Sequence, residues 1–340
     1  MEAPERLIVN DLIERSLRPS AATWLKHIAI LLVTVVTTTL AGTLYPFGRI
    51  SILPEADPQT FSEVVQFIFS LPARYAVLVG SAVTHLLTDP TDLRYGLSFS
   101  LSLLFILICH EMGHYVACRL YKVDATLPFF IPTPPMLGPA GTFGAFIKIR
   151  SPLPSRRAVF DIGVAGPIAG FIALIPIAVI GVARMQPAPP QALLSQGGII
   201  FSDPLLMQMI AAVNGIDLSV SVGNPFYYAA WVGLLVTALN LIPSGQLDGG
   251  HAVFAVFGIV VHRWTGRIAF VAMVVLSILG WFVFNSPSGF LIAILLGIMM
   301  KIRHPVPWDN TPIDAKRKAV ALLTLVIFVL CFLPFPIKIL

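Results

Sequence analysis

The run YGLSFSLSLLFILICHEMGHYVAC, residues 95–118, decides how this sequence is interpreted. It is mainly apolar and long enough to cross a bilayer, for which about 20 residues suffice. Near its end it nevertheless contains two histidines and a glutamate, at His110, Glu111 and His114. Such polar groups are costly inside a membrane and usually functional. The run therefore predicts a membrane helix that contains a polar site.

The composition of the whole chain also indicates a membrane protein. Of its 340 residues, 56% are hydrophobic and only 11% are charged, whereas a soluble domain has about 25% charged residues. The formal net charge of +5 does not indicate nucleic-acid binding, because no basic run is interleaved with exposed aromatic residues. We attribute the excess to basic cytoplasmic loops, and we expect no nucleic-acid partner.

Further apolar runs predict an all-α polytopic membrane protein with about six to eight transmembrane helices. A weaker run at 61–87 contains Pro72 and Arg74, and it fits either a membrane-associated helix or a partial span. The segment 250–261 is apolar but too short to span alone. The clear runs are 24–44, 95–118, 159–183, 226–242, 268–284, 290–300 (short) and 319–335.

The basic residues predict the orientation of the chain. With the N-terminus inside and 61–87 not crossing, 17 of the 22 lysines and arginines fall on the inside. If 61–87 did cross, this positive-inside bias would be lost. The N-terminal sequence has neither the signal-peptide nor the transit-peptide pattern, so we expect the first span to be retained. Together these features predict a multi-pass protein, and the missing transit pattern favours a prokaryotic cell (inner) membrane.

One segment, 127–149, fits neither a span nor an ordinary loop. It is apolar but contains five prolines and three glycines, and its last part, GTFGAFIKI, has the composition of a short strand or hairpin. Non-helical backbone at membrane depth occurs only where it is buried in protein or lines a wet cavity. The segment therefore predicts a short re-entrant β-hairpin.

The residues HEMGH have the spacing of a metal site. Residues i and i+4 share one face of a helix, so His110 and His114 can bind one ion, while Glu111 can accept a proton from water. The alternative is a structural polar cluster that joins two helices. Catalytic zinc has three protein ligands and leaves its fourth position to water or substrate, so a third ligand must come from elsewhere.

The best third ligand is Asp248, in NLIPSGQLDGGH directly after the run 226–242. By itself LDGG could be a turn, in which Asp and Gly are favoured. In the orientation above, however, Asp248 and HEMGH reach the same depth, near the inner face of the membrane. We therefore expect Asp248 to complete the site.

These residues resemble the site-2 protease family of intramembrane zinc metalloproteases. The resemblance lies in HEMGH, in the later N-x-x-P-x-x-x-L-D-G motif (Asn240 to Gly249), and in GTFGAF and DIGVAGPIAG between them. It covers about residues 95–262. The extramembrane segments are too short to contain a PDZ domain. In this respect the chain is similar to the group of the family that lacks one.

The resemblance implies one zinc ion per chain, with His110, His114 and Asp248 as ligands and Glu111 as the general base. Asn240 would lie in the cleft, and the strand with Phe143 and Gly144 would bind an extended substrate. The implied function is an endopeptidase that cuts single-span membrane proteins in or near their transmembrane segment, close to the cytoplasmic face of the bilayer. The oligomeric state is left open.

Two other functions remain as alternatives. A metal or ion transporter could use the same His and Asp residues, although it would not need Glu111 between them. An inactive relative could only bind transmembrane partners. The expected division of the chain is an N-terminal cytoplasmic segment (1–23), a first helix with an external or membrane-associated segment (24–94), a catalytic core (95–262) and C-terminal helices (263–340).

Some residues have weaker assignments. His251 could orient a metal ligand or be a solvated histidine in a turn. Asp161, at the start of a span, suits the helix dipole. Gly166 and Gly170 form a small-xxx-small pair, which indicates close helix packing, and Pro167 should bend the same helix.

Overall fold

The computed structural model describes residues 19–48, 60–136, 139–188, 199–302, 304–305 and 307–339. Most of the expected N-terminal segment 1–23 lies outside these ranges, as do the basic residues Arg6, Arg15, Arg18, Arg49 and Arg303.

Helices dominate the described part of the chain, as the sequence predicts. Five of them are long and apolar enough to cross a membrane: α2 (Ala21–Thr43), α3 (Phe61–Thr88), α4 (Pro90–Leu120), α5 (Arg156–Ala183) and α10 (Ile259–Phe284). The shorter helices are α7 (Leu205–Asn214), α8 (Pro225–Leu241), α9 (Asp248–Phe257), α11 (Ser288–Met299) and α12 (Ala315–Cys331). The all-α polytopic fold is thereby confirmed.

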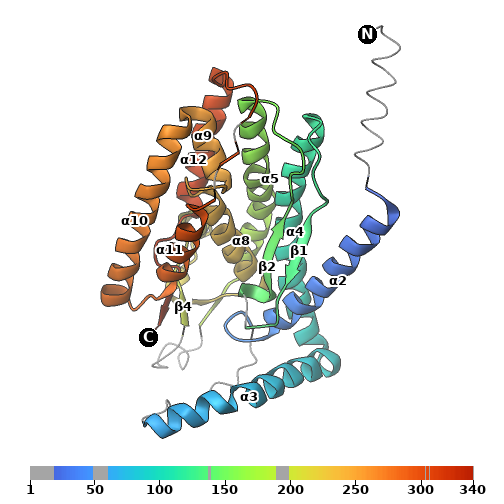
Figure 1. The fold of residues 1–340 in the computed structure, drawn as a ribbon. Coiled ribbons are helices and arrows are strands. Elements are labelled where there is room, and N and C mark those ends of the chain that lie inside the picture. Colours follow the sequence, from blue (N-terminus) through green and yellow to red (C-terminus); the bar gives the residue numbers. More distant parts are fainter. Residues whose placement is uncertain are drawn as a thin grey trace.

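The centre of the bundle is formed by α4, α5 and α8, which pack against one another. Their contact surfaces carry buried side chains such as Ile106, Leu174 and Leu234. Figure 1 shows these helices side by side, with α2 against α4 at one side and α10 with α11 at the other. Because α4 and α5 are apolar around most of their circumference, they are suited to this enclosed position.

A β-hairpin follows α4, as expected for the segment 127–149. Strands β1 (Phe129–Pro132) and β2 (Thr142–Phe146) pair antiparallel, with a register shift between Phe130 and Pro132. A short 3-10 turn, η1 (Pro139–Gly141), precedes β2. Strand β1 packs on α2 and strand β2 on α4, so the hairpin lies against these two helices (Figure 1).

Four very short strands form two further antiparallel pairs. Strand β3 (Gln186–Pro187) pairs with β5 (Ser221–Val222), after a 3-10 turn η2 (Leu218–Val220), and β4 (Ile199–Phe201) pairs with β6 (Ile337–Ile339). The second pair connects the segment after α12 to the segment before α7. It therefore closes the C-terminal end of the described chain onto the middle of the sequence.

Helix α3 differs from the other long helices in its surroundings. Only 6% of an apolar stretch of 18 residues in this helix is buried. Pro72 does not interrupt the helix. In Figure 1 it lies across the lower end of the bundle instead of running beside α4 and α5. This placement fits a membrane-associated helix, and the non-crossing interpretation of 61–87 stays a prediction.

The apolar segment 250–261 is divided between two helices. Helix α9 ends at Phe257, and Gly258, with φ +87°, separates it from α10. A positive φ is readily adopted by glycine and rarely by other residues. The break allows α9 to pack on α5, and this contact brings the start of α9 to the site.

Candidate metal centre

His110, Glu111 and His114 lie in the last third of α4, and all three are buried. The two histidines are one helical turn apart, so their rings share a face of α4, and their Nε2 atoms are 3.2 Å apart. The face points toward α5, the neighbour with which α4 makes its most extensive packing. The HEMGH pattern therefore forms the compact pair of imidazoles that its spacing predicts.

The orientation of His114 is fixed by helix α5. Its Nδ1 lies 2.6 Å from the carbonyl oxygen of Ile162, and since a carbonyl can only accept, Nδ1 carries the proton. In the neutral ring, Nε2 then has a free lone pair. A histidine that donates one N–H to a backbone carbonyl and presents the other nitrogen inward is the usual arrangement of a metal ligand.

Glycines of α5 make room for both imidazoles. A Cβ atom on Gly166 would lie 2.1 Å from Nε2 of His114, and one on Gly170 would lie 3.0 Å from Cβ of His110. The expected small-xxx-small pair therefore does serve close packing, and the groups packed against it are the histidines themselves. A larger side chain at Gly166 would occupy the space of the imidazole.

Asp248 reaches the histidines because the chain turns back sharply after α8. Helix α8 ends at Leu241, and Asp248 is the first residue of α9. A Cβ atom on Gly249 would lie 2.0 Å from the carbonyl oxygen of Leu241, and one on Gly250 would lie 2.6 Å from that of Gly245. The two glycines after the aspartate thus permit the start of α9 to pack directly on the end of α8.

The three groups form a set of converging donor atoms. Oδ2 of Asp248 lies 3.3 Å from Nε2 of His110 and 3.3 Å from Nε2 of His114. Four tetrahedral ligands at about 2.0–2.1 Å from zinc are about 3.3–3.4 Å apart, so the separations fit zinc. Lone pairs that face one another at this distance in a buried site are stabilised by a cation bound between them. In the described part of the chain, this is the single group of three His, Cys, Asp or Glu residues whose ligand atoms all lie within 4.8 Å of one another, in agreement with one zinc per chain.

Glu111 lies beside the cluster without being part of it. Its carboxylate accepts a hydrogen bond from the backbone N–H of Ile147, directly after β2. The hairpin thus contacts the residue that the sequence indicates as the base. Of the two expected substrate-binding positions on β2, Phe143 is exposed, and Gly144 has φ +95° with open space where a Cβ would point.

Asn240 occupies the last turn of α8, next to the histidines. Its Nδ2 lies 3.3 Å from Nε2 of His110. The structure therefore brings Asn240 and Glu111 to the same buried site as the cluster. Both are polar groups that a bound peptide could contact.

His251 is part of a second histidine cluster, which sequence reasoning missed. It lies within α9, and its Nδ1 is 2.8 Å from Nε2 of His304. His262, from α10, is centred 4.8 Å from the His304 ring, and its Nε2 donates to the carbonyl oxygen of Gly245. His262 and His304 stand alone in the sequence without a motif, so no local signal could have identified them.

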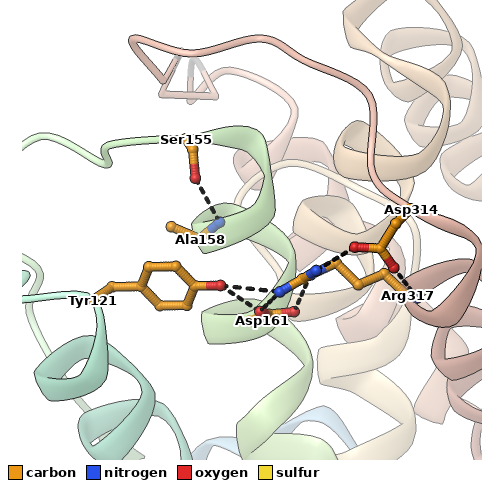
Figure 2. A network of polar contacts seen from close by, with 6 residues as sticks. All are labelled: Tyr121, Ser155, Ala158, Asp161, Asp314 and Arg317. Atoms are coloured by element: carbon orange, nitrogen blue, oxygen red, sulfur yellow. Dashed lines mark hydrogen bonds and ion pairs between the residues drawn. The ribbon is translucent and has the colours of Figure 1, made fainter.

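A polar network also connects α4, α5 and α12, at Tyr121, Asp161, Asp314 and Arg317 (Figure 2). The guanidinium of Arg317 binds both carboxylate oxygens of Asp161, at 2.9 and 2.6 Å, and the hydroxyl of Tyr121 donates to the same carboxylate. Asp161 therefore has partners from two other helices, whereas the sequence suggests only an interaction with the helix dipole. Ser155 caps the start of α5 by accepting from the N–H of Ala158.

Comparison with known proteins agrees with the geometry of this site. The sequence model of peptidase family M50 matches residues 98–281, a range that contains all three clustered residues and Glu111. The chain belongs to peptidase family M50. The resemblance to the site-2 protease family is thereby confirmed.

Several plant proteins are similar to this M50 chain. Probable zinc metalloprotease EGY1, chloroplastic, from Arabidopsis thaliana is 31% identical over 252 residues, which cover 70% of this chain and 43% of that protein. Probable zinc metalloprotease EGY2, chloroplastic, from the same plant is 28% identical over 72% of this chain and 43% of its own length. Its counterpart from Oryza sativa subsp. indica is 26% identical over 85% and 52%.

This M50 chain spans about half the length of these curated relatives. Their names place them in chloroplasts, which conflicts with the expected prokaryotic cell membrane. The coarser expectation of a multi-pass membrane protein holds, because the described residues include several helices capable of spanning a bilayer.

Proposed function

We propose that this chain is an intramembrane zinc endopeptidase. The observation that carries the proposal is the convergence of His110, His114 and Asp248, with donor atoms 3.2–3.3 Å apart, next to the buried Glu111. A buried carboxylate that is not needed as a ligand is explained by a protease, which requires a base. The names of the relatives, each a probable zinc metalloprotease, support the same function.

In this proposal, Nε2 of His110, Nε2 of His114 and Oδ2 of Asp248 would hold the zinc ion. When bound, zinc would act as a Lewis acid on the peptide carbonyl and make water more acidic. Glu111 would accept the proton of the attacking water and return it to the leaving amine. The N–H of Ile147 would keep the carboxylate aimed at the site, and the amide of Asn240 would donate to the substrate carbonyl.

We further propose that the substrate binds in an extended conformation along β2. A peptide bond in a helix is shielded, so a transmembrane substrate must unwind locally before cleavage. Hydrogen bonds to a strand edge offset the loss of its helical hydrogen bonds. Strand β2 suits this role because it leads to Ile147, the backbone contact of Glu111, and because Phe143 and Gly144 leave its surface accessible.

The proposed substrates are single-span membrane proteins, cut close to the membrane face that carries most basic residues. The expected core 95–262 contains the proposed zinc ligands, the proposed base and the proposed substrate-binding residues. On the positive-inside rule this face is cytoplasmic, or its equivalent in an organelle. His251, which bonds to His304, would support the site indirectly.

The decisive test is the substitution Glu111→Gln, which removes the base but keeps the shape of the side chain. General acid–base groups contribute roughly 10²–10⁴-fold to rate, so we expect cleavage of a single-span peptide to fall by at least about 100-fold. Zinc content, measured on the same purified protein, should stay close to that of the wild type. Full activity of the variant in a metal-defined assay would contradict the mechanism.

The same preparation distinguishes the protease from a transporter that uses these ligands. Metal-dependent flux in proteoliposomes, without peptide cleavage, would favour transport. The proposal expects the opposite result, cleavage without flux. Removal of zinc with a chelator should abolish cleavage, and added zinc should restore it.

A further inference from the structure

The segment from His304 to Arg317 lies beyond the residues that match the M50 family, yet it is attached directly to the helices of the metal centre. Its middle pairs with the start of α5, since the N–H of Arg156 donates to the carbonyl of Asp309 at 2.8 Å and that of Asp309 to Pro154 at 3.1 Å. These bonds hold the segment against α5. Its two ends each carry a side chain that reaches toward the site.

At the first end, His304 is enclosed by residues of α9 and α10. Phe254 stacks on its ring with centroids 4.2 Å apart, and His262 meets it edge-on. Nδ1 of His304 donates to the carbonyl of Pro305 at 2.7 Å, so in the neutral ring Nε2 accepts from Nδ1 of His251. Burial lowers the pKa of His304 to about 3, which agrees with a neutral ring.

This contact acts on the helix that carries Asp248. His251 follows Asp248 by three residues, about one turn of α9, and Phe254 follows by six. His304 therefore holds two consecutive turns of the helix whose first residue is the carboxylate ligand. A Cβ on Gly163 would lie 2.8 Å from Cβ of His251, so α9 is enclosed between α5 and His304 and has little freedom to rotate.

At the second end, Arg317 acts on the helices that carry and orient the histidines. It binds Asp161 through both carboxylate oxygens and also donates to the hydroxyl of Tyr121, the C-terminal cap of α4, at 3.2 Å. Asp161 directly precedes Ile162, whose carbonyl accepts the N–H of His114 at 2.6 Å. Arg317, whose contacts with Asp161 and Tyr121 are drawn in Figure 2, therefore fixes the position of α5 relative to α4. It does so one residue away from the carbonyl that accepts from His114.

The geometry points to a new role for this segment: His304 and Arg317 are positioning residues of the metal centre, acting through His251 on Asp248 and through Asp161 on His114. The inference rests on the proposed function, because it takes these residues as zinc ligands. Zinc needs its ligands within a few tenths of an ångström of their ideal distances. Partners that orient ligands typically contribute about 10–100-fold to metal affinity or activity.

The test uses the full-length, zinc-loaded protein and compares three variants with the wild type. His304→Phe keeps the stacking on Phe254 but removes the acceptor for His251, and Arg317→Met removes both bonds to Asp161. Arg267→Met is the matched control, because Arg267 lies on α10 over Trp264. The measurements are zinc affinity against a competing chelator, kcat and KM for a single-span peptide, and the thermal midpoint.

We expect His304→Phe and Arg317→Met each to weaken zinc binding about 10-fold or more and to lower kcat, with KM changed less than kcat. The control should behave like the wild type. His304→Gln, which restores an acceptor, should recover part of the affinity. A role in folding alone would lower only the thermal midpoint, so wild-type zinc affinity and kcat in both variants would overturn the inference.

A further variant covers the case in which Arg317→Met does not fold. Removal of Arg317 leaves the Asp161 carboxylate without its cationic partner, which costs stability. The double variant Arg317→Met, Asp161→Asn avoids this penalty. It should show the same loss of zinc affinity, and wild-type affinity would count against the inference. If the wild type neither binds zinc nor cleaves, the proposed function fails, and the positioning role fails with it.

Discussion

At the scale of single residues, the site depends on glycines that leave room for the clustered side chains as much as on those side chains themselves. His110 and His114 can converge because Gly166 and Gly170 leave no side chain between the imidazoles and the backbone of α5. Asp248 can reach them because Gly249 and Gly250 allow α9 to contact the end of α8. The ligands and the adjacent glycines therefore form one unit.

The substitution Gly166→Ala tests this dependence. Its Cβ would overlap Nε2 of His114, so the ring must leave its present position, and we expect zinc affinity to fall by roughly 10-fold or more, as for the loss of an orienting group. Gly80→Ala is the matched control, since a Cβ there meets nothing within 4 Å. Equal zinc affinity in the two variants would refute the packing argument.

The lowered pKa of His304 also leads us to expect that the stability of the fold depends on pH. Burial lowers its pKa to about 3, whereas in the unfolded chain its pKa is about 6.5. As pH falls, His304 is therefore protonated in the unfolded state before it is protonated in the folded state. The free energy of unfolding decreases as pH falls from about 6.5 toward about 3. In His304→Phe this contribution is absent, so its free energy of unfolding should fall less steeply between pH 7 and pH 5 than that of the wild type. Parallel curves would contradict the prediction.

At the scale of elements, the β-hairpin is the part that departs from a simple helical bundle. Strand β2 packs on α4 and leads to the backbone contact of the buried Glu111, although Phe143 and Phe146 of the strand are themselves exposed. Backbone that is not helical survives there because β1 and β2 satisfy each other's hydrogen bonds. Gly144, with φ +95°, sets the local course of β2.

Gly144→Ala therefore tests the hairpin without changing the metal ligands. There is space for the methyl group, but a positive φ costs a non-glycine residue about 1–2 kcal/mol, which β2 can relieve by changing its backbone path. We expect KM for a transmembrane peptide to rise about 5- to 30-fold, the equivalent of that energy, while zinc content stays unchanged. An unaltered KM would argue against substrate binding along β2.

At the scale of the whole molecule, the order of the helices is consistent with the orientation proposed from basic residues. Helices α4 and α8 both lead toward the metal centre, and α5 returns between them (Figure 1). This places the starts of α5 and α12, with their arginines and lysines, at one end of the bundle. Helix α3 lies at the opposite end (Figure 1).

Cysteine labelling in sealed vesicles checks this orientation. In a background that lacks the natural cysteines, Ser62→Cys, Thr88→Cys and Asn214→Cys should react from one side if α3 does not cross, as we predict. Lys316→Cys should react only from the other side. These four side chains are all exposed, so accessibility depends on sidedness. If Ser62→Cys and Thr88→Cys reacted from different sides, α3 would be a transmembrane helix.

The sequence alone determined the membrane class, most of the long helices and the residues of the metal cluster. Long apolar runs have few alternatives to membrane helices, and HEMGH is a local pattern whose ligands lie on one turn of one helix. Asp248 was also accessible from the sequence, because two polar motifs had to reach the same depth near one membrane face. These are properties of short segments or of the membrane itself.

The tertiary structure alone decided which distant residues support the site. His262, His304 and Arg317 have no motif around them, and only the packing of α10, α12 and the intervening segment on α5 and α9 brings them near His251 and Asp161. Such contacts depend on how helices far apart in the chain pack together. Local periodicity holds no information about that packing, and for this reason the sequence could indicate the proposed ligands but not the distant residues that pack behind them.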